Sequence, residues 1–554
     1  MFTDIVPQLS GQDVMEWFLY NPKEPMLFNT AKFLRLFLIF YFIYILLKDT
    51  FRPRLFFTAG FSIYFYFLCS GPLFVFLLIS SVVDYTLGYF LYREESTVRR
   101  KIYLWFSVIV NLGLLGYFKY ANFLIGTYND VSGSHFHFYE VILPVGISFY
   151  TFQSISYIIE IYRKEIAPTK TFLEYLFFVS FFPQLVAGPI VRAKDFLPQI
   201  YAKLNVTKEE ISYALFLIIG GLIKKTVISD YIALNFVDRV FDLPNAYTPF
   251  ENLMAAYGYT IQIYCDFSGY SDMAIGIALL LGFKLPTNFR TPYKSSSITE
   301  FWRRWHISLS TWLKDFLYIS VGGNRNGTFA GFFFPAVFFL GLILWGATYG
   351  PDSNMPLILG IGSLLVFTLT FVLSKDKDRT MFTNVNLMTT MLLGGLWHGA
   401  SFRFIIWGAL HGMALAVHKL FSEYFPDRKD APKTGAKRVW TFISIILTFH
   451  FVAFCWLFFR AKDFTTALDV INNISMVTFS PEQWKTIIMG YKNVFLLMAI
   501  GYVWHFLPDS FSTSLKKTFD KTPLVIKGII LGFIFWLVYA AAAAGPQPFI
   551  YFQF

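Results

Sequence analysis

The chain has 554 residues, of which 56% are hydrophobic, 21% aromatic and only 15% charged, and its mean hydropathy is +0.52. This composition excludes a soluble protein with one large core and predicts an all-α polytopic membrane protein, because apolar runs long enough to cross ~30 Å of hydrocarbon recur along the chain. A net charge of +11 would indicate nucleic-acid binding in a soluble domain, but here the basic residues lie in short loops between apolar runs. We therefore expect no nucleic-acid partner and a positive-inside topology.

The first five apolar runs predict five crossings. Runs at about 33–47, 55–69, 73–92 and 102–125 are followed by a fifth that ends at Arg163. The basic loops fall at every second connection, which places them in the cytoplasm and the N-terminus outside.

Residues 172–191 are apolar but interrupted by two prolines and a glycine, with basic residues on both flanks. A segment that enters and leaves on the same side of the membrane fits this pattern better than a single crossing. Two crossings follow, at about 213–230 and 253–283. The second contains Gln262 and Asp266, and side chains of this kind are expected to face the bundle interior or a wet cavity.

Residues 297–318 predict one helix that lies at the cytoplasmic interface. Ser297 and Glu300 have the spacing of a capping box at its start. Aromatic and leucine residues at helical spacing define one face, and polar and basic residues, His306 among them, define another. The alternative for His306 is a purely structural histidine on a lipid-anchoring helix.

Two further runs, at about 329–347 and 356–373, predict a hairpin of two crossings. Residues 384–421 then have basic flanks on the same side, which implies either a re-entrant element or a tight helical hairpin around His398. Three final runs follow at about 439–459, 494–507 and 524–544. The total is about 12 crossings plus two re-entrant elements in a single domain of residues 1–554, with both termini outside.

The stretch GGLWHGASFRFIIWGALHG, from Gly394, places two histidines and an arginine in an otherwise apolar run. Ionisable side chains at membrane depth are functional candidates by default because burying them is costly. A neutral imidazole at His398 is suited to act as a general base. The glycines around it predict either a break in the helix or the close approach of another segment. The alternatives are a packed histidine at position 398, and at His411 either a partner of His398 or an interhelical hydrogen bond.

Several kinds of site are absent from the sequence. There is no phosphate-binding glycine loop, nucleophile elbow, zinc-protease motif or dinucleotide fingerprint. Three cysteines lie far apart in apolar runs and are expected to be packing residues. His135 and His137 alone are weak evidence for a metal, so we expect no metal. These observations leave an intramembrane transferase, or a transporter that relays protons through His398, Asp266 and Asp272.

Five long stretches resemble the membrane-bound O-acyltransferase family, specifically its bacterial branch for alginate O-acetylation and teichoic-acid D-alanyl transfer. They occur in the order LPVGISFYTFQSISYIIEIYR (from Leu143), FFPQLVAGPIVR (Phe181), IYCDFSGYSDMAIG (Ile263), FRTPYKSSSITEFWRRWHISLSTWLKDFLYISVGGNR (Phe289) and LLGGLWHGASFRFIIWGALHG (Leu392). The resemblance implies a ring of transmembrane helices with re-entrant elements and a central funnel. It also implies that His398 is the essential catalytic residue and His306 a second catalytic histidine near the donor side. The substrate-binding candidates are Arg303, Arg304, Trp305, Trp397, Asp266, Gln262 and His411.

The resemblance further implies the reaction. An acyl group, most often acetyl, would pass from a cytoplasmic thioester, acyl-CoA or an acyl carrier, across the bacterial inner membrane to hydroxyls of an exported polysaccharide or cell-envelope glycan. We expect no bound cofactor and a periplasmic SGNH-type esterase or transferase as partner, while a lipid or protein acceptor is the alternative within the enzyme class. Residues 326–380 depart from the family pattern as an inserted transmembrane hairpin, expected at the periphery.

Overall fold

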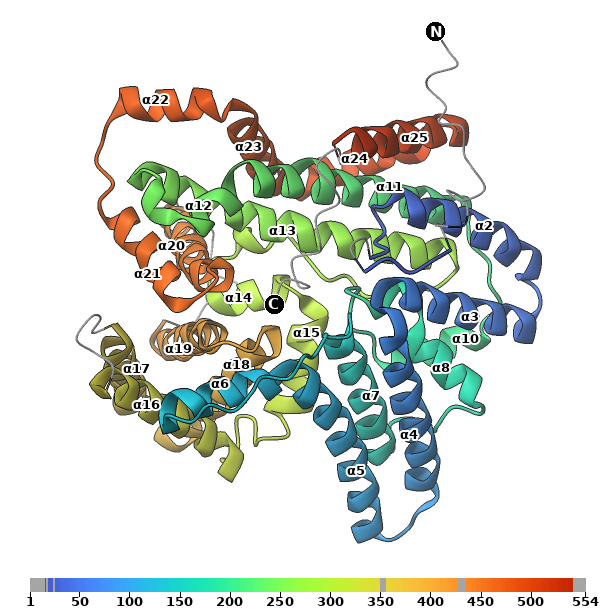
Figure 1. The fold of residues 1–554 in the computed structure, drawn as a ribbon, viewed down its shortest axis with the longest axis horizontal. Coiled ribbons are helices and arrows are strands. Elements are labelled where there is room, and N and C mark those ends of the chain that lie inside the picture. The colour runs from blue at the N-terminus through green and yellow to red at the C-terminus, as the bar shows by residue number, and fades with distance from the viewer. Residues whose placement is uncertain (1–14, 16–17, 23–24, 349–354, 426–434, 542–554) are drawn as a thin grey trace. The chain divides into compact units, whose positions relative to one another are not determined.

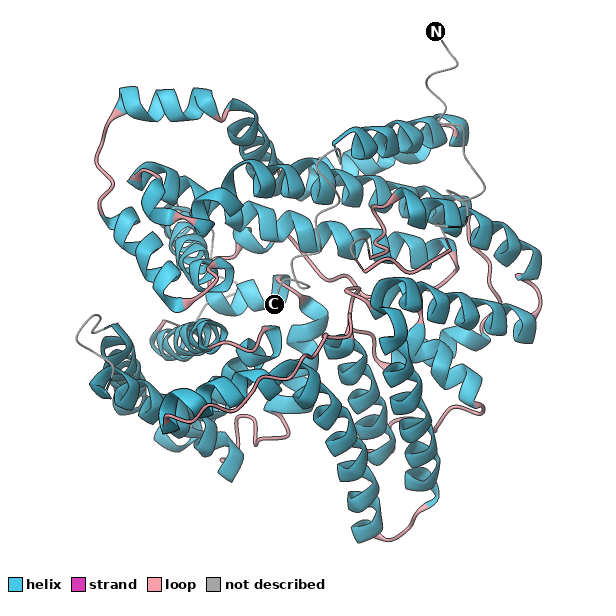
Figure 2. Cartoon of the chain, viewed as in Figure 1, coloured by secondary structure: helices cyan, strands magenta, loops and turns pink. Residues whose placement is uncertain are grey.

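The computed structural model of the protein describes residues 15, 18–22, 25–348, 355–425 and 435–541. Every regular element in these ranges is a helix (Figures 1 and 2), which confirms the all-α prediction. Helices satisfy their backbone hydrogen bonds within one segment, as hydrocarbon requires. The ring of helices and its central funnel stay predictions.

Several helices of this described part are membrane spans by length and composition. Five stretches qualify, and the number rises to seven if each of two sharply bent helix pairs is one span. The stretches are Phe51–Arg93, Thr97–Ser132, Lys208–Asp242, Phe402–Tyr424 and Gly435–Arg460, and the bent pairs are Pro481–Gly490 with Lys492–Phe506 and Asp509–Lys521 with Leu524–Val538. The protein is therefore a multi-pass membrane protein. The total of about 12 crossings and the side of each terminus stay predictions, and the two chain ends lie outside the described residues.

The chain groups into two compact units. The first comprises Met1–Asp230, Cys265–Pro286 and Pro508–Gln553. Its helices in the described ranges are α2 (Ala31–Leu47), α3 (Phe51–Ser70), α4 (Phe74–Arg93), α5 (Thr97–Leu115), α6 (Ala121–Ser132), α7 (Ile147–Tyr162), α8 (Phe172–Ser180), α9 (Phe182–Leu185), α10 (Ala193–Tyr201), α11 (Lys208–Leu222), α24 (Asp509–Lys521) and α25 (Leu524–Ala541). The prediction of a single domain is not tested by this grouping.

The predicted broken segment at 172–191 is broken in the structure. α8 begins at a capping box formed by Thr171 and Glu174 and ends at Ser180, and the short α9 starts at Phe182. The side from which this segment enters and leaves the membrane stays a prediction.

The second unit comprises Tyr231–Tyr264 and Thr287–Leu507. Its helices in the described ranges are α12 (Asp238–Asp242), α14 (Ile298–Arg304), α15 (Ile307–Trp312), α16 (Phe329–Thr348), α17 (Met355–Leu373), α18 (Lys377–His398), α19 (Phe402–Tyr424), α20 (Gly435–Arg460), α21 (Phe464–Ser475), α22 (Pro481–Gly490) and α23 (Lys492–Phe506). The long α13 (Pro249–Leu280) contributes residues to both units. The three cysteines are buried free thiols, each in a helix, as expected of packing residues.

The hairpin predicted within 326–380 is present as α16 and α17. Both pack against the pair α18 and α19, with a shared apolar cluster of Phe339, Met388, Leu392 and Ala409. Its status as an insertion and its peripheral position stay predictions.

Two expectations about the site segments are corrected. Residues 297–318 are not one helix at a lipid interface: α14 and α15 are separated at Trp305 and His306, and the chain continues as a π-helix over Leu313–Tyr318. The face with Phe301 and Trp305 is buried against protein. Of the two alternatives for 384–421, the structure has the helical hairpin, because α18 and α19 are joined by only the three residues 399–401.

Candidate active site

The glycines of the WHG region let α18 and α19 touch backbone to backbone. A Cβ built on Gly395 would overlap the carbonyl oxygen of Phe404, and one on Gly408 would overlap that of Met391. α18 stays helical through Gly394 and Gly395 up to His398. The prediction of a helix break is therefore wrong for these two glycines, and close approach is the correct alternative.

His398 ends α18 and is 4% exposed. Its ring contacts those of Trp397, Trp407 and Phe459, with centroids 4.9, 5.0 and 5.2 Å away. Three aromatic rings from α18, α19 and α20 therefore hold the imidazole in one orientation and largely out of water.

Arg403 reaches from α19 to the end of α20. Its Nη1 donates to the carbonyl oxygen of Phe459 at 2.7 Å, and its guanidinium lies 4.3 Å from the centroid of the Phe404 ring. A cation at the last turn of a helix satisfies a carbonyl that has no partner within the helix. Arg403 thereby positions the residue whose ring packs on His398.

His411 forms no hydrogen bond with His398, which was one of the two alternatives for His411 in the sequence. Its ring packs on Trp407 at 4.7 Å and on Trp302 at 5.2 Å, and it is fully buried. Neither ring nitrogen has a hydrogen-bond partner among the described residues, so the interhelical hydrogen bond expected there is wrong. Trp407 is the ring that contacts both histidines.

His306 sits at the junction of α14 and α15 with a left-handed backbone, φ 41°. Its Nδ1 lies 3.1 Å from Oδ1 of Asn288, which also accepts from the backbone N–H and hydroxyl of Ser308 at 3.2 and 3.0 Å. The Ser308 N–H identifies that atom as oxygen, so Nδ1 of His306 carries the hydrogen and Nε2 carries the lone pair. Burial lowers the pKa of His306 to about 3, which keeps the ring neutral at physiological pH.

Asn288 also explains why the helix breaks. The Ile307 N–H donates to the Asn288 carbonyl, and the Arg290 N–H donates to the Arg304 carbonyl, each at 2.9 Å. The preceding loop thus supplies partners for backbone groups at the end of α14 and the start of α15.

Trp305 and Trp397 frame this region. The Trp305 ring, 1% exposed, packs between Phe301 and Trp456, with centroids 5.7 and 4.9 Å away. The Trp397 ring lies 6.2 Å from that of His306 and contacts His398. The structure thus brings both predicted catalytic histidines, both tryptophans and His411 together in the second unit.

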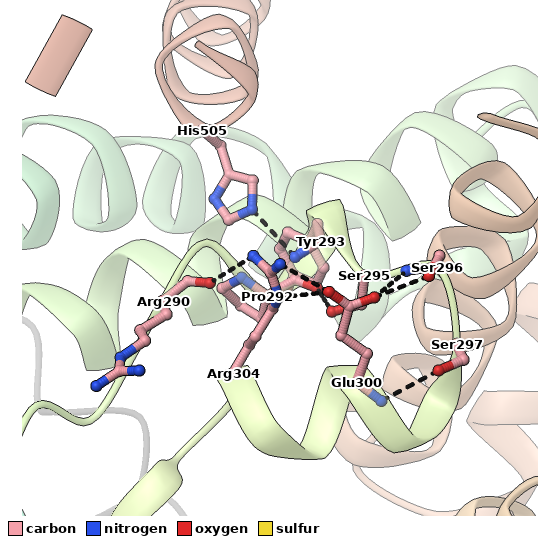
Figure 3. A network of polar contacts seen from close by, with 9 residues as sticks. All are labelled: Arg290, Pro292, Tyr293, Ser295, Ser296, Ser297, Glu300, Arg304 and His505. Atoms are coloured by element: carbon pink, nitrogen blue, oxygen red, sulfur yellow. Dashed lines mark hydrogen bonds and ion pairs between the residues drawn. The ribbon is translucent and has the colours of Figure 1, made fainter. Parts of the chain in front are cut away.

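Arg303 and Arg304 are placed differently, and Figure 3 shows the polar contacts of Arg304. Arg304 pairs with Glu300 at 2.7 Å, and the Glu300 carboxylate accepts from Ser296 at its N–H and hydroxyl, both at 2.8 Å. Ser297 caps the helix by accepting from the Glu300 N–H at 3.2 Å. Only this half of the predicted capping box forms, because Glu300 reaches Ser296 instead. Arg303 is exposed.

Asp266 and Gln262 are both buried, in different units. Asp266 belongs to the first unit, where Lys225 bridges it at 2.5 Å and Asp230 at 2.8 Å. Lys225 and Asp230 meet across a π-helical stretch, Ile223–Asp230, whose wider turn brings residues five apart together. Asp272 likewise pairs with Lys224 at 2.5 Å. Carboxylates held in ion pairs are poor members of a proton relay, which disfavours the transporter alternative.

Comparison with known proteins decides the class. The sequence model of MBOAT, the membrane-bound O-acyltransferase family, matches residues 163–350. The chain is 34% identical to the probable alginate O-acetylase AlgI of Pseudomonas putida, over 96% of this chain and 100% of the relative. This chain belongs to the membrane-bound O-acyltransferase family. It is also 34% identical to the peptidoglycan O-acetyltransferase of Helicobacter pylori, over 82% of each, and 28% identical to the teichoic acid D-alanyltransferase of Bacillus subtilis, over 59% of this chain and 71% of the relative.

Family membership makes the chain an O-acyltransferase and confirms the resemblance seen in the sequence. Within this MBOAT chain the matched residues include His306 but end before α18 and His398. The catalytic and substrate-binding roles of individual residues stay predictions. His135 and His137 are exposed, and no group of three or more metal-binding side chains lies together in the described part of this chain.

The sequence does not predict the roles of four side chains that shape this MBOAT site, which are Asn288, Arg403, Trp407 and Phe459. It also does not predict the ion pairs of Lys225 in the first unit. Arg403 was noticed as a charge in an apolar run but was given no role. The lysine had the same signal, since it lies in an apolar run opposite a helix with carboxylates. Asn288 and Phe459 carry no local signal, because the histidines that they contact are remote in sequence. Trp407 is one aromatic residue among several in an apolar run, so it does not stand out either.

Proposed function

We propose that this protein transfers an acyl group, most directly acetyl, from a thioester donor to hydroxyls of a polysaccharide or cell-envelope glycan. The observation that carries the proposal is the buried His398 at the end of α18, enclosed by three aromatic rings in a chain of the O-acyltransferase family. The relatives are named for transfer of acetyl groups to alginate, of acetyl groups to peptidoglycan and of D-alanyl groups to teichoic acid. They support a polymer acceptor here.

In the proposed step, neutral His398 accepts the proton of the attacking hydroxyl as its oxygen bonds to the thioester carbonyl carbon. The carbon–sulfur bond then breaks, and the proton passes from the imidazolium to the leaving thiolate. The products are an ester and a free thiol, so atoms and charge balance. General-base assistance of this kind contributes roughly 10²–10⁴-fold to rate.

His306 is proposed as the second histidine of the reaction. Its Nε2 is the basic nitrogen because Asn288 fixes the hydrogen on Nδ1. The Trp397 ring, which contacts both imidazoles, sets how the two histidines are spaced.

The donor is proposed to be cytoplasmic, either acyl-CoA or an acyl carrier, and the acyl group to cross the bacterial inner membrane. Basic loops between apolar runs support this orientation. The glycan is acylated directly or through a periplasmic SGNH-type partner.

The test is release of free thiol from acetyl-CoA and longer acyl-CoAs by purified protein in nanodiscs. We expect turnover by the wild type and a loss of at least 100-fold in His398→Ala protein of equal yield and thermal midpoint. Equal turnover by the two proteins would overturn the role of His398. With a labelled acetyl group on the donor, recovery of the label on lipid or protein, and not on glycan, would overturn the proposed acceptor.

A further inference from the structure

The first unit holds a carboxylate at membrane depth that has no role in the proposed reaction. Asp84 lies in α4, inside a predicted membrane span, and its side chain is fully buried. It is nine residues before Arg93, where α4 ends, and therefore about 14 Å from that basic end at 1.5 Å per residue. This depth is close to the middle of the ~30 Å hydrocarbon layer, where bulk water does not solvate a charge.

Every partner of Asp84 that the structure describes is electrically neutral. Its Oδ1 accepts from the Ser107 hydroxyl at 2.5 Å and from the Asn111 amide at 3.0 Å, and its Oδ2 accepts from the same amide at 2.9 Å. The Tyr175 hydroxyl lies 3.5 Å from Oδ2 and 3.1 Å from the Ser154 hydroxyl. No lysine, arginine or histidine of the described ranges acts on this carboxylate. Hydrogen bonds offset only part of the cost of burying a full negative charge.

The groups around Asp84 come from four helices that pack side by side, α4, α5, α7 and α8 (Figure 1). They are a carboxylate from α4, a hydroxyl and an amide from α5, a hydroxyl from α7 and a phenol from α8. Carboxylate, hydroxyl and amide oxygens are the ligands that hard cations prefer. A hydroxyl that donates its hydrogen keeps two lone pairs, so it can contact a cation at the same time.

Asn111 gives a second, independent indication of a ligand. Its side chain is 1% exposed, and its Oδ1 has no hydrogen-bond partner among the described residues. Its Nδ2 also donates to the Ser107 carbonyl at 3.0 Å, so all three partners of that atom are acceptors and the assignment of nitrogen and oxygen is fixed. A buried acceptor without a donor is costly. A cation that contacts both Asp84 and this Oδ1 would neutralise the carboxylate and satisfy the amide.

The number of carboxylates decides which cation fits. Among the described residues that act on Asp84, none carries a second carboxylate. One monovalent cation neutralises one carboxylate, whereas a divalent cation would leave an excess charge in a region of low dielectric. The close spacing of the oxygens favours Na⁺ over the larger K⁺. Such a site needs a single carboxylate, so the absence of clustered histidine, cysteine and carboxylate ligands in the described part does not exclude it.

We propose that Asp84, Ser107 and Asn111 bind a Na⁺ ion between α4 and α5, beside the hydroxyls of Ser154 and Tyr175. The ion neutralises the buried carboxylate and joins helices of the first unit. Because the folded protein binds Na⁺ and the unfolded chain does not, stability rises with Na⁺ concentration. This proposal does not rest on the proposed function, since no step of acyl transfer uses these residues.

The binding test uses the full chain in nanodiscs and radioactive Na⁺ in choline chloride buffer. We expect saturable binding by the wild type and none by Asp84→Asn, which keeps the size of the side chain and removes its charge. Ser107→Ala should weaken binding at least tenfold. The matched control is Ser156→Ala, at a buried serine of α7 whose hydroxyl donates within its own helix at 2.8 Å, and it should bind as the wild type does.

Two results of this binding test would overturn the site. One is the absence of saturable Na⁺ binding by the wild type, and the other is equal binding by the wild type and Asp84→Asn. If Asp84→Asn protein does not fold, the two serine variants decide, and equal affinity of Ser107→Ala and Ser156→Ala would overturn the proposal.

Thermal midpoints give a second readout. At equal ionic strength, the wild type should unfold at a higher temperature in NaCl than in choline chloride, with a smaller rise in KCl. Asp84→Asn should have the same midpoint in all three salts. A wild-type midpoint that is the same in NaCl and in choline chloride would overturn the proposal.

Infrared spectroscopy separates Na⁺ from a proton as the group that neutralises Asp84. A carboxylate that binds Na⁺ stays ionised, so in NaCl the wild type and Asp84→Asn should have the same absorbance at the C=O stretch of protonated carboxylic acids. A band of that kind that is present in the wild type and lost in Asp84→Asn would assign a proton to Asp84 and overturn the Na⁺ site.

Discussion

The imidazole of His398 and the indole of Trp407 stand nearly perpendicular, at 85°, with ring centroids 5.0 Å apart. Trp407 also packs on His411 and Phe459. The orientation of the proposed general base therefore depends on the packing of one tryptophan.

Removal of the Trp407 ring should lower activity without removing any reacting group. We expect Trp407→Ala to reduce kcat by about 10–100-fold, because a misplaced base loses alignment with the attacking hydroxyl. Trp407→Phe keeps a ring and should retain most of kcat. Steady-state thiol release measures both, and an alanine variant as active as the phenylalanine variant would contradict this positioning role.

The contact between α18 and α19 should tolerate no side chain at position 408. A methyl group there overlaps the Met391 carbonyl, so Gly408→Ala is expected to cost about 1–3 kcal/mol of stability. Gly362→Ala, at a site in α17 with nothing within 4 Å, is the matched control and should change stability by less than about 1 kcal/mol. Thermal midpoints in detergent compare them, and equal midpoints would show that the helices separate at little cost.

His306 should make the protein less stable in mild acid. Burial lowers its pKa to about 3, whereas the unfolded chain has a histidine pKa near 6.5. Below pH 6.5 the unfolded state binds a proton that the folded state does not, so stability is full above 6.5 and falls as the pH drops towards 3, by up to about 1.4 kcal/mol per pH unit.

The matched variant is His306→Asn, since asparagine tolerates a left-handed backbone and does not titrate. Thermal midpoints at pH 7.5, 6.0 and 5.0 should decline less steeply in the variant than in the wild type. The same pH slope in both proteins would mean that the folded chain accepts the proton at His306.

The two arginines of α14 should give different phenotypes. Arg304 is ion-paired with Glu300 and its side chain is 31% exposed, so Arg304→Ala should lower stability by about 0.5 kcal/mol. Arg303 is free to meet a phosphorylated donor, and Arg303→Ala should raise KM for the donor several-fold at an unchanged thermal midpoint. Unchanged KM in both alanine variants would remove this helix from donor recognition.

Asp266 should matter for stability and not for substrate binding. Asp266→Asn leaves the buried Lys225 with one carboxylate fewer, which is expected to cost about 3–5 kcal/mol. Asp272→Asn, whose carboxylate is 30% exposed, should cost less than about 1 kcal/mol. Thermal midpoints and KM are measured together, and a stable Asp266→Asn protein with a raised KM would restore the substrate-binding role.

Much of the fold could be predicted because hydrophobic length is a local property. The runs that became α3, α4 and α20 each lie within one continuous apolar stretch. The amphipathic helices α21, α22 and α24 were not predicted, because with 12, 10 and 13 residues and many polar positions they do not stand out by hydropathy.

The sequence predicts which residues belong to the candidate site better than it predicts how they are arranged. His398 stood out as a polar residue at a costly position, and His306 through the family resemblance, and both are buried in one unit. The break at His306 could not be predicted, because it depends on Asn288, 18 positions earlier. The partner of Asp266 was missed for the same reason, since Lys225 lies on another helix.

Arg403 donates a hydrogen bond to the carbonyl oxygen of Phe459 in the last turn of α20, and the ring of Phe459 packs on His398. A hydrogen bond of 2.7 Å thus ties α19 to the end of the 26-residue α20, and a ring contact connects that same end to the imidazole. Any force that shifts α20 along its axis is transmitted to the proposed base, so events at the loop after Arg460 have a mechanical route to the reaction centre that involves no substrate contact.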